Sequence, residues 1–127
     1  LEATRFFPDH TFVVAAAQAL SDDFLLPYLQ NYPNVGVVRG QTYEILRSSV
    51  AALVKSGTST LETALLNVPQ VVCYAGSPFS YHIARRLVEV KYISLVNLIM
   101  DQPLVKELIQ NDLTSENIRQ ELQHLLD

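Results

Sequence analysis

Residues 51–74 read AALVKSGTSTLETALLNVPQVVCY, and this stretch decides the fold. The apolar run at 51–55 is typical of a buried strand, and the small residues Ser56, Gly57 and Thr58 form a loop after it. A helix is expected over about 60–66, and a second strand over 69–74. A strand, a helix and a strand in this order predict a βαβ unit with parallel strands.

The same alternation continues on both sides of this unit. Further strands are predicted at 11–17, 35–38 and 92–95, and further helices at 24–32, 42–48, 104–109, from Ser77-Pro78 and from Thr114. Pro27 predicts that the first of these helices starts near it or is kinked there, and Thr42 is the expected N-cap of the next. Together the elements predict a single Rossmann-like domain over residues 1–127, a three-layer α/β/α arrangement around a mostly parallel sheet.

Composition and charge exclude several classes of protein. The chain has 127 residues, 49% of them hydrophobic and 17% charged, with a net charge of −4, which suits one globular domain and argues against a nucleic-acid binder. The single cysteine, Cys73, suits a reducing compartment and is expected in the core. His10 and His124 lack acidic or cysteine partners at ligand spacing, so no metal site is expected. The chain opens in mid-pattern without a methionine, and we expect it to be a fragment of a longer protein.

The loop after the strand at 51–55 is the strongest candidate for a ligand site. Ligands of open parallel sheets bind beyond the carboxyl ends of the strands. The N–H groups at the start of the following helix lack partners within the helix, and Gly57 allows a ligand to come close to the backbone. The hydroxyls of Thr58, Ser59 and Thr60 add donors. The loop therefore predicts a diphosphate site.

A purely structural interpretation of this loop stays open. Ser59 and Glu62 have the S-x-x-E spacing of a capping box, which closes a helix start without any ligand. The loop contains neither a Walker lysine nor Gly-x-Gly-x-x-Gly. Spacing alone assigns no chemical role to Glu62.

Three segments together carry a resemblance to a known family. Residues 56–72 read SGTSTLETALLNVPQVV, residues 80–87 read SYHIARRL, and residues 91–99 read KYISLVNLI. This combination resembles the signature of the lipid-A-disaccharide synthases. The resemblance implies the carboxy-terminal half of a GT-B glycosyltransferase, which binds the nucleotide sugar. It also implies transfer of diacylglucosamine from its UDP donor to lipid X, giving the lipid A disaccharide and UDP, with no metal and no cofactor.

The resemblance also assigns roles to individual residues. Ser56 to Thr60 match the loop that faces the diphosphate, and Glu62 matches an acid that accepts hydrogen bonds from the ribose hydroxyls. By analogy, the backbone at Val38 and Arg39 pairs with the uracil edge. Asn97 matches a position that contacts sugar or phosphate near the donor site. The acceptor domain, with the proposed general base, lies outside this chain, so no catalytic residue beyond the supporting Asn97 is expected and the fragment is expected to be inactive alone.

Aromatic and basic residues accompany the middle segment. Arg85, Arg86 and Lys91 occur near Phe79 and Tyr81. They form either a surface for anionic headgroups or phosphate, with Tyr81 and Arg85 as substrate-binding candidates, or an ordinary solvated helix face.

The lipid substrates of the family imply peripheral association with the cytoplasmic face of the bacterial inner membrane. Two alternatives stay open on sequence grounds. One is another GT-B member, such as the peptidoglycan UDP-N-acetylglucosamine transferase or a UDP-N-acetylglucosamine epimerase. The other is a non-catalytic module that forms a homodimer.

Overall fold

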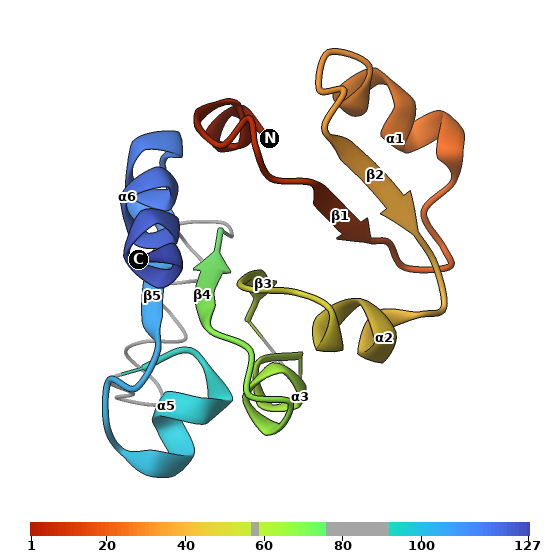
Figure 1. Cartoon of the computed structure of the whole chain (residues 1–127). Helices are drawn as coiled ribbons and strands as arrows, with labels where there is room; N and C mark the ends of the chain where they lie inside the picture. The colour runs from red at the N-terminus through yellow and green to blue at the C-terminus, as the bar shows by residue number, and fades with distance from the viewer. Residues whose placement is uncertain (57–58, 76–91) are drawn as a thin grey trace. The chain divides into compact units, whose positions relative to one another are not determined.

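The computed structural model describes residues 1–56, 59–75 and 92–127 of the chain. These residues divide into two compact units, Leu1–Ser49 and Val50–Asp127, each described here by itself (Figure 1). The predicted helix that starts at Ser77-Pro78 lies outside the described residues. The prediction of a single domain over 1–127 stays a prediction.

The first unit is built on two parallel strands. Strand β1 (Phe12–Ala15) pairs with β2 (Val35–Val38), with Phe12 opposite Val35. A 3-10 helix, η1 (Glu2–Phe6), precedes them, and the buried Phe7 that follows it packs on Phe12 with ring centroids 6.3 Å apart. Helices α1 (Asp22–Leu29) and α2 (Thr42–Arg47) follow the two strands. The two predicted strands of this unit are confirmed.

Both helices of the first unit begin differently from the prediction. Helix α1 begins at Asp22, before Pro27, because the Ser21 hydroxyl caps it by accepting from the Phe24 N–H at 3.2 Å. Pro27 therefore lies inside the helix, where one backbone donor is lost. Thr42 is not the N-cap of α2. That position is Gln41, which makes no capping bond through its side chain.

The second unit contains a parallel sheet of three strands in the order β3–β4–β5. The strands are β3 (Ala52–Lys55), β4 (Gln70–Tyr74) and β5 (Lys106–Ile109). Helix α3 (Ser59–Leu65) connects the first two, and α5 (Leu95–Met100) precedes the third. A short 3-10 helix, η2 (Gln110–Asp112), and helix α6 (Ser115–Leu126) end the chain. The predicted βαβ unit is confirmed, with the expected helix and both strands in place.

Neighbouring residues of β5 show that helices cover both faces of this sheet. Successive side chains of a strand point to opposite faces. Lys106 places its Nζ 3.9 Å from a carboxylate oxygen of Glu121 in α6, whereas Glu107 binds the start of α5. Helix α3 contacts α5 and therefore belongs to the same layer. The three-layer α/β/α arrangement is confirmed for this unit, and α6 stands apart from α3 and α5 in Figure 1.

Two predictions for the segment 92–109 are wrong. Residues 92–94 form no strand, and the Ser94 hydroxyl caps α5 by accepting from the Asn97 N–H at 3.2 Å. The predicted helix over 104–109 is strand β5 instead, because its backbone pairs with β4, with Leu108 opposite Cys73. In residues 104–109, pairing with β4 outweighs the local preference for a helix.

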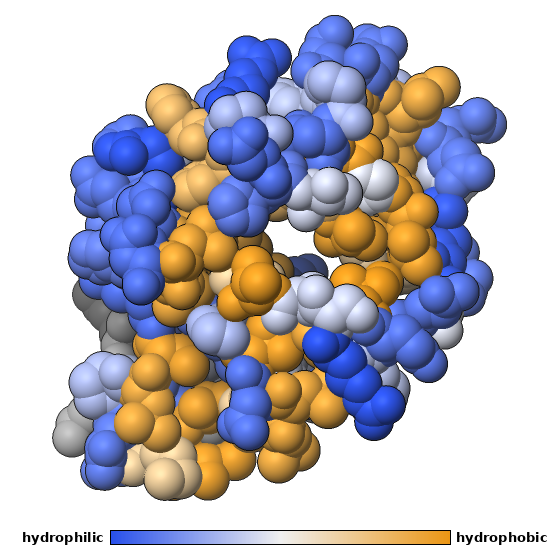
Figure 2. Space-filling view, in the orientation of Figure 1, coloured by the Kyte–Doolittle hydropathy of each residue, from blue (hydrophilic) through white to orange (hydrophobic). Residues whose placement is uncertain are grey.

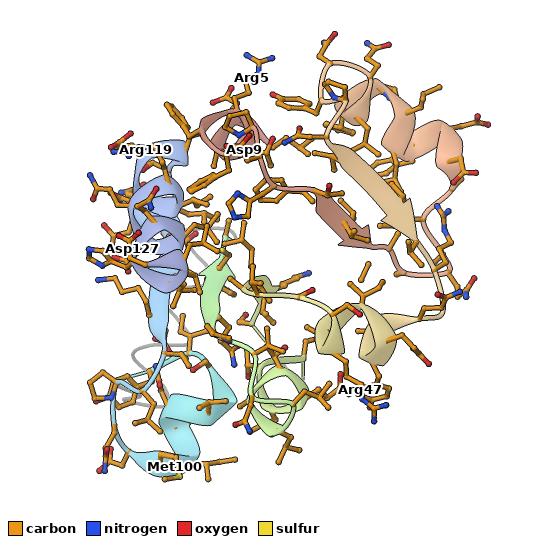
Figure 3. The ribbon with its side chains drawn as sticks, viewed as in Figure 1. Arg5, Asp9, Arg47, Met100, Arg119 and Asp127 are labelled. Atoms are coloured by element: carbon orange, nitrogen blue, oxygen red, sulfur yellow. The ribbon has the colours of Figure 1, made fainter. Side chains whose placement is uncertain are left out.

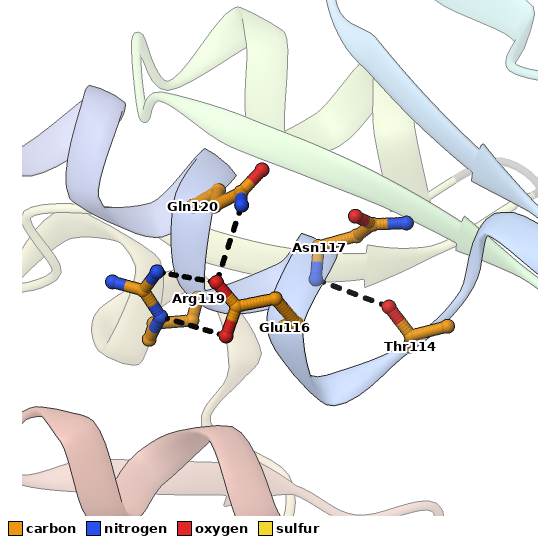
Figure 4. Close-up of polar contacts among 5 residues, drawn as sticks. All are labelled: Thr114, Glu116, Asn117, Arg119 and Gln120. Atoms are coloured by element: carbon orange, nitrogen blue, oxygen red, sulfur yellow. Dashed lines mark hydrogen bonds and ion pairs between the residues drawn. The ribbon is translucent and has the colours of Figure 1, made fainter.

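Helix α6 matches its prediction closely. Thr114 is its N-cap, and the Thr114 hydroxyl accepts from the Asn117 N–H at 3.1 Å (Figure 4). On the exposed side, Arg119 binds both carboxylate oxygens of Glu116, and the Gln120 amide donates to the same carboxylate at 3.2 Å. The apolar stripe, Ile118, Leu122, Leu125 and Leu126, is at least half-buried, with Leu122 4% exposed.

The core of the second unit lies around β4, where Val71 and Val72 are almost fully buried. Apolar side chains also reach the surface at the ends of α3 and α5, where Leu65, Ile99 and Met100 are exposed, and at Leu104 between α5 and β5. Figure 2 shows apolar surface over these helices, and Figure 3 labels Met100 at the outer end of α5. Among the described residues, the helices are too short or too polar to cross a bilayer.

Candidate functional site

The loop between β3 and α3 lies at the carboxyl edge of the second sheet. Strand β3 ends at Lys55, and the Ser56 N–H that follows donates to the Cys73 carbonyl of β4 at 3.2 Å. Helix α3 begins three residues later at Ser59, whose side chain is exposed. The structure therefore brings the two ends of the predicted phosphate loop to the edge where parallel sheets bind ligands. Gly57 and Thr58 lie outside the described residues.

Buried polar groups hold the first turn of α3 on the sheet. Thr60 has no exposed surface, and its carbonyl accepts from the Gln70 side-chain amide of β4 at 3.0 Å. The Thr63 hydroxyl, also buried, donates to the Ser59 carbonyl at 2.7 Å. The first turn therefore directs Ser59 outward and Thr60 toward the core. Of the two hydroxyls, only that of Ser59 belongs to an exposed residue.

The beginning of α3 also bears on the structural interpretation of Ser59 and Glu62. A capping box requires its serine immediately before the first helical residue. Ser59 is itself the first residue of α3, and Glu62 is half-exposed in the first turn. The residue before Ser59 lies outside the described residues, so the capping-box interpretation stays open beside the ligand interpretation. The predicted contact between Glu62 and a ribose stays a prediction.

In the first unit, Val38 and Arg39 follow the end of β2 and are engaged within the protein. The Val38 carbonyl accepts from the Ala16 N–H at 3.0 Å. The Arg39 guanidinium donates to Asp22 and to the Leu20 carbonyl, both at 2.6 Å, and so ties the start of α1 to the end of β2. Next to it, Gly40 has φ of +71°, a conformation that glycine adopts at little cost. The predicted contact of this segment with uracil stays a prediction.

Asn97 lies in a buried polar cluster between α5 and β5. Its side-chain N–H groups donate to the Val105 carbonyl at 2.9 Å and to Glu107 at 3.1 Å, and its oxygen accepts from the Val105 N–H at 3.0 Å. Both amide hydrogens are therefore in use, and the residue is 1% exposed. The predicted contact with sugar or phosphate stays a prediction, but this geometry gives Asn97 a structural task.

Glu107 is the residue of this cluster that sequence reasoning missed. Its carboxylate accepts from the backbone N–H groups of Ile93, at 3.1 Å, and Ser94, at 2.8 Å, as well as from Asn97. The available signal is an acidic residue among the apolar residues of LVKELI at 104–109. That signal is weak, because it does not indicate which N–H groups the carboxylate meets.

The remaining candidates from the sequence are the residues near Tyr81, the cysteine and the possible metal ligands. Tyr81 and Arg85, the substrate-binding candidates, lie outside the described residues, as do Arg86 and Lys91. Burial raises the pKa of the Cys73 thiol, which keeps the sulfur neutral in β4 at physiological pH. Within the described ranges, no three His, Cys, Asp or Glu side chains gather as metal ligands would.

Comparisons with known proteins identify the family of the chain. The family model described as lipid-A-disaccharide synthetase matches residues 1–127. The chain belongs to this family. A lipid-A-disaccharide synthase of Anaeromyxobacter sp. (strain K) is 45% identical over 121 residues, which cover 94% of this chain and 32% of the relative.

Two further relatives with the same name are more distant. The protein of Psychromonas ingrahamii is 43% identical over 97% of this chain and 33% of its own length. The protein of Geobacter sulfurreducens is 34% identical over 95% of this chain and 32% of its own length. This member of the family therefore spans about a third of the length of the curated relatives it matches.

Proposed function

We propose that this chain is the donor-nucleotide-binding part of a GT-B glycosyltransferase of lipid A biosynthesis. The proposed enzyme transfers 2,3-diacylglucosamine from UDP-2,3-diacylglucosamine to lipid X, giving lipid A disaccharide 1-phosphate and UDP. The observation that carries the proposal is the family match over residues 1–127 together with Ser56 and Ser59 at the carboxyl edge of a parallel sheet. The chain is proposed to be inactive alone, with its general base outside these residues.

The chemistry explains why the loop before α3 suits such a transfer. In an inverting displacement, the acceptor hydroxyl attacks the anomeric carbon while UDP leaves, and negative charge grows on the diphosphate. Donors directed at that charge stabilise the transition state more than the bound substrate. The backbone N–H groups at the start of α3 and the exposed Ser59 are such donors. Glu62, in the same turn, is proposed to accept from the ribose hydroxyls.

The direct test is turnover by the full-length protein that carries this chain. We expect disaccharide and UDP from UDP-2,3-diacylglucosamine and lipid X, and no product when UDP-N-acetylglucosamine replaces the donor. Epimerised sugar nucleotide from UDP-N-acetylglucosamine without any acceptor would favour the epimerase alternative, and transfer of N-acetylglucosamine to a peptidoglycan lipid precursor supplied as acceptor would favour the peptidoglycan alternative. Absence of product from both donors would reject the proposal.

The site of action is a further part of the proposal. Because both substrates are lipids, we expect peripheral association with the cytoplasmic face of the inner membrane, measured as co-sedimentation of the full-length protein with lipid vesicles. A homodimer is also proposed, and light scattering of the full-length protein checks it. Recovery of the protein entirely in the supernatant, or a monomer mass, would contradict the respective expectation.

A further inference from the structure

The two loops that follow the strands of the first unit are tied together at the carboxyl edge of its sheet. The Arg39 guanidinium, directly after β2, donates to a carboxylate oxygen of Asp22 and to the Leu20 carbonyl, both at 2.6 Å. Leu20 lies between β1 and α1, and Asp22 is the first residue of α1. Because the two terminal nitrogens of one planar guanidinium bind two acceptors of the neighbouring loop, they fix the two loops relative to each other.

A second contact holds the same two loops at close range. Gly40 has φ of +71°, and a Cβ atom added to it would lie 3.4 Å from the side-chain nitrogen of Gln18. The exposed Gln18 amide therefore lies beside the backbone that leaves β2. Parallel sheets bind ligands at this edge, and both loops that form it lie within the described residues.

The charges at this edge disfavour a phosphate. The Asp22 carboxylate pairs with the positive charge of Arg39, whose side chain is only 25% exposed. Asp23 adds a second carboxylate in the first turn of α1, and Glu44 adds one in the first turn of α2. Because carboxylates at the starts of both helices repel an anion, this edge suits an uncharged group that forms hydrogen bonds with backbone and amide groups.

We propose that Asp22 is a positioning residue for the base of the donor nucleotide. The base is uncharged, unlike the diphosphate, and the resemblance implies that its edge pairs with the backbone at Val38 and Arg39. Asp22 makes no contact with the base. It holds the Arg39 side chain at the start of α1, and so fixes the backbone of Arg39 and Gly40 at the edge of the sheet. This inference rests on the proposed function, and it adds a residue that the resemblance did not assign.

The test measures how well the full-length protein distinguishes UDP from CDP. Uracil presents a carbonyl acceptor where cytosine presents an amino donor, so backbone groups held in a fixed position bind one base and reject the other. Asp22→Ala removes an acceptor of Arg39. Asp23→Ala is the matched control, because it removes a carboxylate from the same turn of α1. Calorimetry gives the dissociation constants of both nucleotides for each variant.

For Asp22→Ala we expect binding of UDP to weaken about fivefold and binding of CDP to change less than twofold, an effect in the range of an exposed ion pair, since the Asp22 side chain is 86% exposed. For Asp23→Ala we expect both constants to stay within about twofold of wild type. Asp22→Glu keeps the carboxylate and is expected to restore most of the selectivity for UDP. Asp22→Asn keeps the shape without the charge, is expected to lower that selectivity about threefold, and decides the matter where the alanine variant does not fold.

The outcomes separate this inference from the function on which it rests. Failure of the wild-type protein to bind UDP would reject the proposed function and this inference with it. Tight binding of UDP by wild type, with its selectivity over CDP unchanged in Asp22→Ala, would leave the function standing and overturn the inference. Equal losses of affinity for UDP and CDP in Asp22→Ala would make Asp22 a purely structural residue, which also overturns it.

Discussion

Ser59 is the residue of the proposed site whose local structure best suits a contact with a ligand. It is the first residue of α3 and is exposed, while its neighbour Thr60 is fully buried. In the sequence SGTST, the hydroxyls of Ser59 and Thr60 are equivalent candidates for a ligand contact. In the fold they differ, because the residue that carries the first is exposed and the residue that carries the second is buried. In this geometry, Ser59 is the hydroxyl suited to a ligand, and Thr60 stabilises the turn.

Replacement of this hydroxyl gives a prediction at the residue scale. If Ser59 donates to the diphosphate as proposed, Ser59→Ala in the proposed enzyme removes one hydrogen bond to a charged group, an interaction worth about 1.5–3 kcal/mol. We therefore expect kcat/KM for the UDP donor to fall about tenfold or more. Steady-state kinetics measure this, with Ser48→Ala as the control, because the hydroxyl of the exposed Ser48, the C-cap of α2, donates to the Glu44 carbonyl. Equal constants for Ser59→Ala and wild type would remove Ser59 from the site.

At the scale of elements, helix α6 and strand β5 show what the sequence could predict and what it could not. Helix α6 was predictable because Thr114 caps it and an apolar stripe repeats at helical spacing, both of which are local signals. Strand β5 was not, since residues 104–109, LVKELI, are a short segment whose state depends on pairing with β4. The same limit applies to Glu107 and Asn97, whose hydrogen bonds join segments that only the fold brings together.

The ion pair between Glu116 and Arg119 in helix α6 predicts a dependence of stability on pH. The hydrogen bond from Arg119 holds the pKa of the Glu116 carboxyl below its ordinary value of 4.5, and the Gln120 side chain contributes in the same direction. A lowered pKa in the folded state stabilises the helix above about pH 4.5, and this contribution is lost as the pH falls through the lowered value. NMR titration of Glu116 should give a midpoint below 4.5 that rises toward 4.5 in Arg119→Gln. An unchanged midpoint in that variant would contradict the assigned cause.

At the scale of the whole molecule, the parallel strand order places the proposed nucleotide site at one edge of the sheet of the second unit. Strands β3, β4 and β5 all end at the same edge, and the loop from Ser56 to Ser59 leaves the sheet there. The alternation of strands and helices in the sequence is sufficient to predict this edge, because it indicates parallel strands. The alternation does not indicate which groups of this edge would contact the proposed nucleotide, because that depends on side-chain contacts that only the fold creates.

The most direct measurement compares the affinities of the full-length protein for UDP and UMP. If the start of α3 holds the second phosphate, its charge-assisted hydrogen bonds should make UDP bind about ten- to a hundredfold more tightly than UMP. Calorimetry at one fixed salt concentration provides both dissociation constants. Equal affinities for the two nucleotides would contradict the placement of a diphosphate at this edge of the sheet.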